Sequence, residues 1–210
     1  FGTASDPLVT VTNTDPLYPV PTQQFHIPAN AVAAIGTDAH MSFYDATQPG
    51  KLWTYFGCSF VNGHDVTGGI TTALGGVWDT TGNGLTNTVT PGSDYDYAAG
   101  VITDYDVSQA AINHMVRLAI SPDALKSPGA DWMQNIPWPN NHEDYNGPRD
   151  YTGSIVAGST FGIPMSVNLN SLGLSQGGLM LAKALQNYGG LWRDQGGTNQ
   201  VTFYSTPENE

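Results

Sequence analysis

The segment from residue 112 to residue 120 alternates in a way that only a β-strand explains. Ile112, Val116, Leu118 and Ile120 are aliphatic, and His114 takes the remaining place in the alternation. Successive side chains of a strand point to opposite faces, so this period of two predicts a strand with one buried or concave face. A titratable ring on such a face needs a hydrogen-bond partner or a chemical role. His114 is therefore the first functional candidate, with a satisfied core histidine as the competing interpretation.

Composition favours the same fold class for the rest of the chain. Charged residues make up only 11% of the 210 residues, against about 25% in an average soluble protein. Thr, Asn, Gly, Ser and Asp take their place, and these residues suit turns and strand surfaces better than long helices. We expect a mainly β protein, a single-domain β-sandwich of jelly-roll type over residues 1–210 with one or two packed helices.

Local signals place the few elements that the sequence marks clearly. The proline-rich residues 6–28 predict an extended entry with edge-strand character, and a short helix is expected to begin at Asp106 with Gln109 as its capping partner. The clearest helix covers residues 175–188, with Ser175 as N-cap. Leu185 lies on its apolar face, so Leu185→Ala is expected to cost about 2–4 kcal/mol.

Charge and cysteine content exclude several classes of protein. The net charge is −12 with only six Lys plus Arg, which argues against nucleic-acid binding and against attraction to anionic membranes. No run approaches the roughly 20 apolar residues of a membrane span, so no membrane insertion is expected. Cys58 is the single cysteine and cannot form an intramolecular disulfide. The chain begins at Phe1 without an initiator Met, which suggests secretion with removal of a leader, or a domain cut from a longer chain.

Six short motifs occur in a defined order between about residues 30 and 195. They are Asp38-Ala39-His40, Ala98-Ala99-Gly100-Val101, Ile112-Asn113-His114-Met115-Val116, Trp138-Pro139-Asn140-Asn141-His142, Leu172-Gly173-Leu174-Ser175 and Ala184-Leu185-Gln186-Asn187-Tyr188-Gly189. In this order they resemble a set of secreted proteins of environmental bacteria and their phages, although Met115 stands where that set has Ala. The resemblance implies an extracellular location and a carbohydrate-rich setting, and it carries no mechanism.

Histidines and carboxylates in these motifs form the candidate catalytic group. The candidates are His114, Asp38, His40, Asp104 and His142. Asp38 is two residues from His40 and so shares its strand face, and Asp104 and Asp106 both precede the His114 strand closely enough to reach it. A carboxylate and a histidine meeting in a cleft provide the base and the acid for glycan cleavage, by water attack or by β-elimination. The alternative is that Asp38 and Asp104 only cap turns.

Aspartates near residue 100 offer a candidate calcium site. Asp94, Asp96 and Asp106 form the densest acidic group, and carboxylate oxygens are the ligands that calcium prefers. No metal is required by the catalytic hypothesis. A transition-metal site of the cupin kind is disfavoured because the His-x-His spacing with a later Glu is absent.

Aromatic side chains suggest how a sugar would be held. Apolar sugar faces stack on aromatic rings, and neighbouring polar groups bind the hydroxyls. The candidate substrate-binding residues are Trp53, Trp78, Trp138, Tyr105 and Glu143. Trp78 is expected in a long loop over residues 62–93, and Trp138 and Glu143 in a second one over residues 121–154. Core packing of each tryptophan, and a solvated loop charge at Glu143, are the competing interpretations.

These features together predict a secreted carbohydrate-active protein that cleaves a polysaccharide by hydrolysis or lyase chemistry. The alternative is a non-catalytic module: a glycan-binding or adhesion domain, or a structural subunit of an extracellular assembly. The low charge and the long Thr- and Gly-rich loops suit both classes equally. Substrate, linkage and oligomeric state stay open.

Overall fold

A computed structural model of the chain describes residues 1–14, 21–35, 38–82, 99–129, 135–138, 140, 143–144 and 147–206. The chain divides into two compact units, Phe1–Tyr97 (unit 1) and Ala98–Glu210 (unit 2). This division does not test whether the chain folds as one domain, so the expectation of a single domain stays a prediction. The described chain is mainly β, as the composition predicts.

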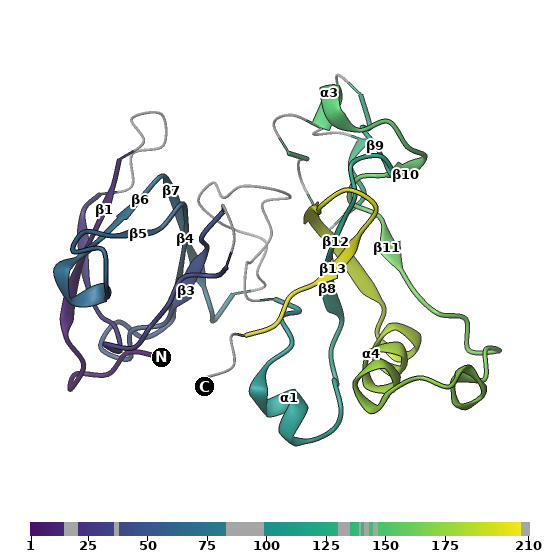
Figure 1. Cartoon of the computed structure of the whole chain (residues 1–210), viewed down its shortest axis with the longest axis horizontal. Helices are drawn as coiled ribbons and strands as arrows, with labels where there is room; N and C mark the ends of the chain where they lie inside the picture. Colours follow the sequence, from purple (N-terminus) through teal and green to yellow (C-terminus); the bar gives the residue numbers. More distant parts are fainter. Residues whose placement is uncertain are drawn as a thin grey trace. The chain divides into compact units, whose positions relative to one another are not determined.

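Unit 1 is built from short strands and one turn of 3-10 helix (Figure 1). Its described elements are β1 (Leu8–Asn13), β2 (Gln23–His26), β3 (Met41–Phe43), β4 (Lys51–Phe56), β5 (Ser59–Phe60), η1 (Val66–Gly68), β6 (Ile70–Thr72) and β7 (Leu74–Asp79). They form one sheet in the order β2-β1-β6-β5 and another in the order β3-β4-β7. Within the proline-rich entry, β2 is an edge strand, as predicted, whereas β1 pairs on both sides.

One apolar core takes side chains from both sheets of unit 1. Val9 and Phe25 come from the first sheet, and Phe43, Trp53 and Tyr55 come from the second. The Phe25 ring lies 5.0 Å from that of Phe43 and 4.9 Å from that of Trp53, measured between ring centroids. Aromatic pairs at this spacing add to the stability gained from buried area alone. The two sheets of unit 1 therefore share a single hydrophobic interior.

The described part of unit 2 combines a mixed four-stranded sheet with α-helices and a 3-10 helix (Figure 1). Its described elements are α1 (Asp104–Ser108), β8 (Val116–Ile120), β9 (Leu125–Lys126), α3 (Gly147–Asp150), β10 (Ile155–Val156), β11 (Thr160–Phe161), η2 (Leu169–Leu172), α4 (Gln176–Asn187), β12 (Gly190–Gln195) and β13 (Val201–Phe203). The main sheet has the order β11-β12-β8-β13, and β9 pairs with β10. Among the described helices, none is long and apolar enough to cross a membrane.

The central strand β8 corrects the interpretation of the residue 112–120 segment. The strand begins at Val116, and all five of its residues are buried. It pairs with β12 on one side and with β13 on the other, so both of its hydrogen-bonding edges are occupied. Because residues on both of its faces are buried, each face needs apolar or paired side chains. The prediction that His114 lies on this strand is wrong, because His114 lies in a bend before it.

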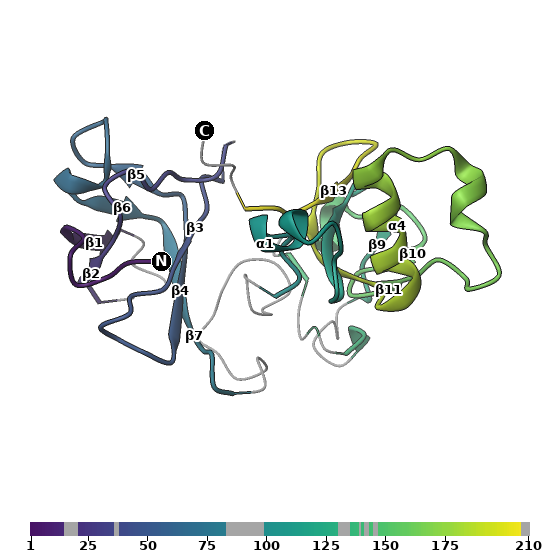
Figure 2. The ribbon, with the colours of Figure 1, turned by 90° about the horizontal axis from the view of Figure 1, so that it is seen from below.

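The predicted long helix is confirmed, and the predicted short one begins earlier than expected. Helix α4 starts after Ser175, whose side chain accepts a hydrogen bond from the Gly178 N–H at 3.1 Å. Figure 2 shows α4 from below, and the amide of Gln186, near the end of this helix, donates to the Pro164 carbonyl in the chain that follows β11. Helix α1 is capped by Thr103, so Asp106 is its third residue and not its start.

Candidate functional site

The carboxylate beside His114 belongs to Asp106, one of the two aspartates that the sequence places just before the His114 segment. The His114 Nε2 lies 3.2 Å from Asp106 Oδ2, and its Nδ1 lies 2.9 Å from the Met115 carbonyl oxygen. The side chain is 37% exposed, so solvent reaches the ring while the Asp106 carboxylate stays largely covered. His114 is therefore accessible to solvent and is not bonded to backbone alone. A ring sealed in the core and bonded only to backbone could have no chemical role, and His114 does not fit that description.

Both ring nitrogens of His114 face oxygen acceptors. A neutral imidazole has one N–H donor, whereas an imidazolium has two. Only the protonated ring therefore donates to Met115 and to Asp106 at once. Burial raises the pKa of Asp106, but the hydroxyl and backbone N–H of Thr103, with the His114 ring, more than offset this and lower it overall. The Asp106 carboxylate is thus held ionised beside the ring.

Local chain geometry fixes Asp106 where His114 can reach it. The Thr103 hydroxyl and N–H donate to Asp106 Oδ2 at 2.6 and 2.8 Å, which makes a capping box at the start of α1. Gly100, with a φ of 78°, accepts a hydrogen bond from the Arg117 N–H, and a Cβ there would lie 2.7 Å from that nitrogen. A side chain at position 100 would collide with the backbone of β8, so only glycine allows the two segments to come this close. The hydrogen bond between Gly100 and Arg117 thereby joins the segment before α1 to the start of β8.

The other residues of helix α1 lie at the surface. Tyr105 is 72% exposed, as a substrate-binding ring requires. Asp104 is also exposed, and its Oδ1 accepts a hydrogen bond from the Thr206 hydroxyl at 3.1 Å. Asp106, which the sequence suggests as a calcium ligand, is the partner of His114. Asp104, which the sequence suggests as a catalytic residue, instead accepts the hydrogen bond from Thr206. The capping-box spacing from Thr103 to Asp106 was the signal that could have identified the role of Asp106.

Asp38 and His40 form the expected pair within unit 1. The His40 Nε2 lies 3.9 Å from Asp38 Oδ2, and the imidazole packs against the Phe56 ring with 5.3 Å between centroids. The side chain of His40 is 15% exposed. These residues belong to unit 1 and His114 belongs to unit 2, so their convergence on one site stays a prediction.

Three further candidates lie outside the described residues. These are His142, Asp94 and Asp96. Within the described part of the chain, no group of three or more His, Cys, Asp or Glu side chains is placed to hold a metal ion. The Oδ2 atom of Asp106 accepts a hydrogen bond from the Thr103 hydroxyl and lies within hydrogen-bond distance of His114 Nε2.

The expected sugar-binding aromatics separate into buried and exposed rings. Trp53 is 5% exposed on β4, and Trp78 is 1% exposed on β7, so both serve the core and neither can stack on a surface sugar. The placement of Trp78 in a loop is wrong, because it lies on β7, whereas β6 falls within residues 70–74, where a short strand piece is expected. Trp138 is 76% exposed and keeps the binding role open.

Glu143 is buried rather than presented to a substrate. Only 3% of the residue is exposed, and Oε1 accepts a hydrogen bond from the Ser127 hydroxyl at 2.6 Å. Its Oε2 has no hydrogen-bond partner among the described residues. Burial raises the pKa of Glu143, with a further increase from the nearby Asp144 charge. Glu143 therefore belongs to the interior of unit 2.

Unit 2 also contains a pair of neighbouring carboxyl groups, Asp144 and Asp194, that no sequence pattern indicated as a site. The backbone N–H of Gln195 donates to Asp194 Oδ1 at 2.9 Å and to Asp144 Oδ2 at 3.4 Å, so the two carboxyls converge on one donor. The Tyr151 hydroxyl donates to Asp144 Oδ2 at 3.3 Å. Burial and the Asp144 charge raise the pKa of Asp194 well above its usual range, despite nearby Arg193. Asp144 and Asp194 form the carboxyl pair of unit 2.

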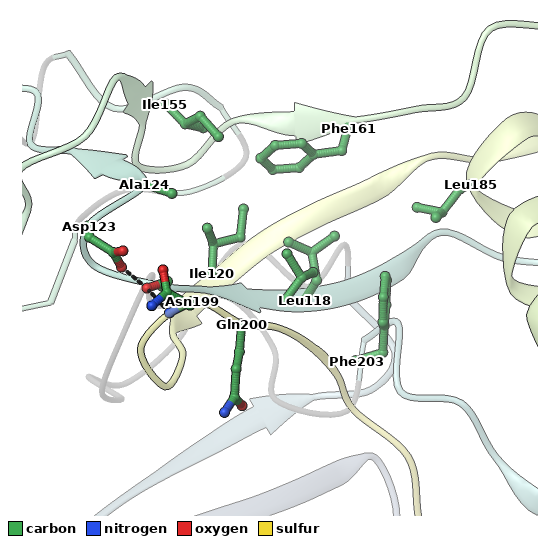
Figure 3. A pocket seen from close by; sticks show the side chains of 12 residues that line it. Leu118, Ile120, Asp123, Ala124, Ile155, Phe161, Leu185, Asn199, Gln200 and Phe203 are labelled. Carbon is green, nitrogen blue, oxygen red and sulfur yellow. Dashed lines mark hydrogen bonds between the residues drawn. The ribbon is translucent and has the colours of Figure 1, made fainter.

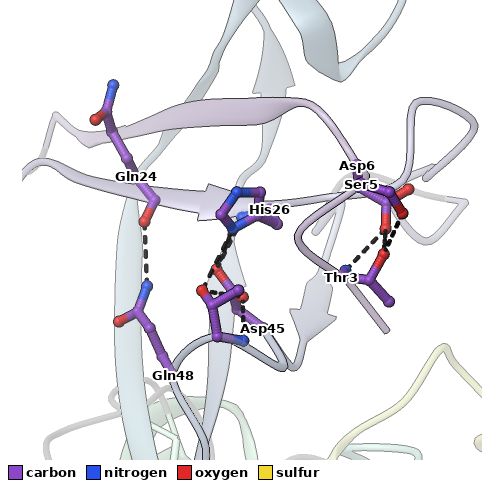
Figure 4. Close-up of polar contacts among 8 residues, drawn as sticks. Thr3, Ser5, Asp6, Gln24, His26, Asp45 and Gln48 are labelled. Atoms are coloured by element: carbon purple, nitrogen blue, oxygen red, sulfur yellow. Dashed lines mark hydrogen bonds and ion pairs between the residues drawn. The ribbon is translucent and has the colours of Figure 1, made fainter.

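Unit 1 contains another histidine–carboxylate pair, shown in Figure 4. Asp45, 1% exposed, accepts from the backbone N–H of His26 at 2.8 Å and from the hydroxyl and N–H of Thr47 at 2.7 and 2.8 Å. The His26 Nδ1 lies 3.3 Å from the same carboxylate. These donors outweigh the burial of Asp45 and lower its pKa to about 2. The pair fastens β2 to the turn after β3.

Comparison with known proteins adds no assignment to this geometry. No protein-family model, no curated protein and no solved structure matches the chain. The case for a function therefore depends on the residues themselves.

Proposed function

We propose that the chain is a secreted, carbohydrate-active protein that cleaves a polysaccharide by acid–base chemistry at His114. The observation that carries this proposal is the 3.2 Å contact between His114 Nε2 and Asp106 Oδ2 on a ring that solvent reaches. A carboxylate behind a histidine orients the ring and stabilises its protonated form, which is how proteins prepare a histidine for proton transfer. Asp106 is the positioning residue in this scheme.

The hydrogen bonds around the ring suggest which nitrogen exchanges the proton. Nε2 faces the ionised Asp106, and hydrogen bonds to charged acceptors are stronger than those to neutral ones. Nδ1 faces only the neutral Met115 carbonyl. We assign proton transfer to Nδ1, which can leave that carbonyl and turn to a substrate oxygen, or to the proton removed in β-elimination, while Asp106 keeps its hold on Nε2.

Substrate contacts are assigned to the exposed aromatics of unit 2. Tyr105 and Trp138, 72% and 76% exposed, present ring faces on which a sugar can stack. Asp104 lies exposed beside Tyr105, and we retain it, with Asp38, His40 and His142, as a proposed contributor. A polysaccharide substrate and an extracellular location belong to this same proposal. It needs no metal ion.

The sandwich architecture is also part of the proposal. In unit 1, the sheets β2-β1-β6-β5 and β3-β4-β7 contribute to one apolar core, and two sheets that share an inner face are what a β-sandwich requires. This supports a sandwich in unit 1. The jelly-roll connection is a finer expectation that an experimental structure would test.

A glycan panel tests the activity. Purified chain is incubated with neutral, acidic and amino polysaccharides, and both new reducing ends and ultraviolet absorbance of unsaturated products are followed. Reducing ends without absorbance indicate hydrolysis, and both signals together indicate lyase chemistry. Loss of turnover in His114→Ala with an unchanged circular dichroism spectrum supports the proposal, whereas turnover that survives this change contradicts it.

One observation favours the non-catalytic alternative, a glycan-binding or adhesion module. Two cavities in the described parts of the chain, of about 370 and 300 Å³, are lined by residues other than His114, Tyr105 and Trp138. Rings that are exposed at the surface suit binding to the side of a glycan chain. Glycan binding that Trp138→Ala abolishes, with no turnover on any member of the panel, would establish this alternative.

A further inference from the structure

Unit 2 contains an apolar cavity of about 370 Å³ on one face of its main sheet (Figure 3). Leu118 and Ile120 of the central strand β8 form its floor, and Phe161, Leu185 and Phe203 contribute from β11, α4 and β13. The volume falls in the range of about 300–1,000 Å³ that is usual for small-molecule pockets. Four elements that are distant in sequence thus enclose one apolar space.

The walls of this cavity are less buried than its floor. Leu118 and Ile120 are 2% and 4% exposed, whereas Phe161, Leu185 and Phe203 keep intermediate exposure. Large apolar side chains normally bury their surface against neighbours, and here part of that surface faces the cavity. An apolar molecule that entered would cover it and gain from leaving water.

The mouth of the cavity is polar and carries the charge of Asp123. The Ser121 hydroxyl donates to the Asp123 carboxylate and accepts a hydrogen bond from the Asn199 N–H at 2.8 Å. Asp123, Asn199 and Gln200 are exposed, and the described residues that line the cavity include no Lys, Arg or His. With a net chain charge of −12 as well, an anionic headgroup is repelled at this mouth and a cationic one is attracted.

We propose that this cavity binds a small amphiphilic amine, with an alkyl or aryl body among Leu118, Ile120 and Phe161 and an ammonium head at Asp123. The apolar lining selects the body, and the Asp123 carboxylate at the mouth selects the head. The site shares no residue with the His114 group, so the two proposals succeed or fail separately.

Three probes with the same body and different heads test the proposal on the intact chain: hexylammonium, hexanol and hexanoate. Binding is followed by calorimetry and by methyl NMR shifts. The structure predicts binding in the order hexylammonium, hexanol, hexanoate, with shifts at Leu118 and Ile120 and none at Val9 and Val11 of the unit 1 core. Absence of binding by all three probes, or shifts that do not include Leu118 and Ile120, overturns the proposal.

Two matched pairs of variants test the two parts of the site. Ala124, which borders the cavity (Figure 3), is enlarged in Ala124→Leu, with exposed Ala46→Leu as its control. Filling the space is expected to weaken hexanol binding by about tenfold or more, which corresponds to about 1.4 kcal/mol. Unchanged affinity in a folded Ala124→Leu protein contradicts the site, and if this variant does not fold, the methyl shifts of the unmodified chain decide.

The charge at the mouth is tested by Asp123→Asn. Asp79→Asn is its control, because Asp79 is also exposed and also accepts a hydroxyl hydrogen bond from a residue two positions away. Asp123→Asn is expected to weaken hexylammonium binding about two- to fivefold, the size of an exposed ion pair, and to leave hexanol binding unchanged. An equal effect of the two substitutions, or a loss with hexanol as well, shows that Asp123 does not select the head.

Discussion

Two buried carboxylates, one in each unit, set the local structure around them, and each of these two is held by several donors. Asp45 in unit 1 and Asp106 in unit 2 both accept hydroxyl and backbone N–H hydrogen bonds, and both lie beside a histidine. An ionised group is stable inside a protein only with such compensation. The same contacts that lower the pKa of each carboxyl also make it contribute to stability.

Asp45→Asn should destabilise unit 1 by about 1–3 kcal/mol at neutral pH, because hydrogen bonds to a charged acceptor become hydrogen bonds to an amide. The folded pKa of Asp45 is lowered to about 2, so its contribution is complete above its unfolded value, near 4, and disappears as the pH falls toward 2. Urea unfolding at pH 7 and pH 3 measures this, with exposed Asp123→Asn as the control. A cost that is equal at the two pH values would contradict the assignment.

Asp194→Asn should behave in the opposite sense. The folded pKa of Asp194 is raised by burial and by Asp144, so ionisation penalises the folded state increasingly as the pH rises above the unfolded value. The asparagine cannot ionise, and the variant should therefore gain stability relative to the unmodified chain between pH 5 and pH 8. Denaturant titration at both pH values tests this, and a difference that does not change with pH would show that the carboxyl pair is not coupled.

At the scale of elements, the sequence identified those with strong local signals. Helix α4 was predicted within a residue or two because Ser175 caps it and its apolar residues recur at helical spacing. Strand β8 was recognised, but its start and its burial were not, because burial on both faces depends on side chains that pack against the sheet from segments distant in sequence, and no local pattern encodes them. Trp78 was misplaced for the same reason, since only its pairing partner β4 shows that it lies in a strand.

Leu185→Ala should cost about 1–2 kcal/mol, less than its place on the apolar helix face predicts. Leu185 packs near Val116 and Gly190 but keeps one side toward the 370 Å³ cavity, so fewer contacts are lost on truncation. Leu125→Ala, at a fully buried position of the same unit, should cost about 2–5 kcal/mol. Chemical denaturation compares the two, and equal costs would mean that the cavity is filled in solution.

At the scale of the whole molecule, the sequence predicted the mainly β class and did not indicate two compact units. Composition is an average over the chain and cannot locate a boundary between two units. The boundary after Tyr97 follows from contacts between residues that are distant in sequence. The candidate site was recovered in part: His114 was identified, but its partner Asp106 depended on where α1 begins.

Val9→Ala tests whether the two units unfold separately. Val9 is 1% exposed in the core of unit 1, and the substitution should speed hydrogen exchange of the β1 and β2 amides. If the units are thermodynamically independent, as we expect from their separate cores, the amides of β8 and β12 keep their protection. Equal acceleration in all four strands would instead support the single domain that the sequence predicts.

The proposed activity depends on proton transfer by His114 while Asp106 holds the imidazole ring in place. The most direct measurement is kcat on the responding glycan for His114→Gln beside His64→Gln, an exposed histidine of unit 1, with both melting temperatures recorded. General acid–base catalysis contributes about 10²–10⁴-fold, so His114→Gln should lower kcat by at least 10²-fold while His64→Gln leaves it unchanged. Equal kcat values for the two variants, with both proteins folded, would contradict the proposal.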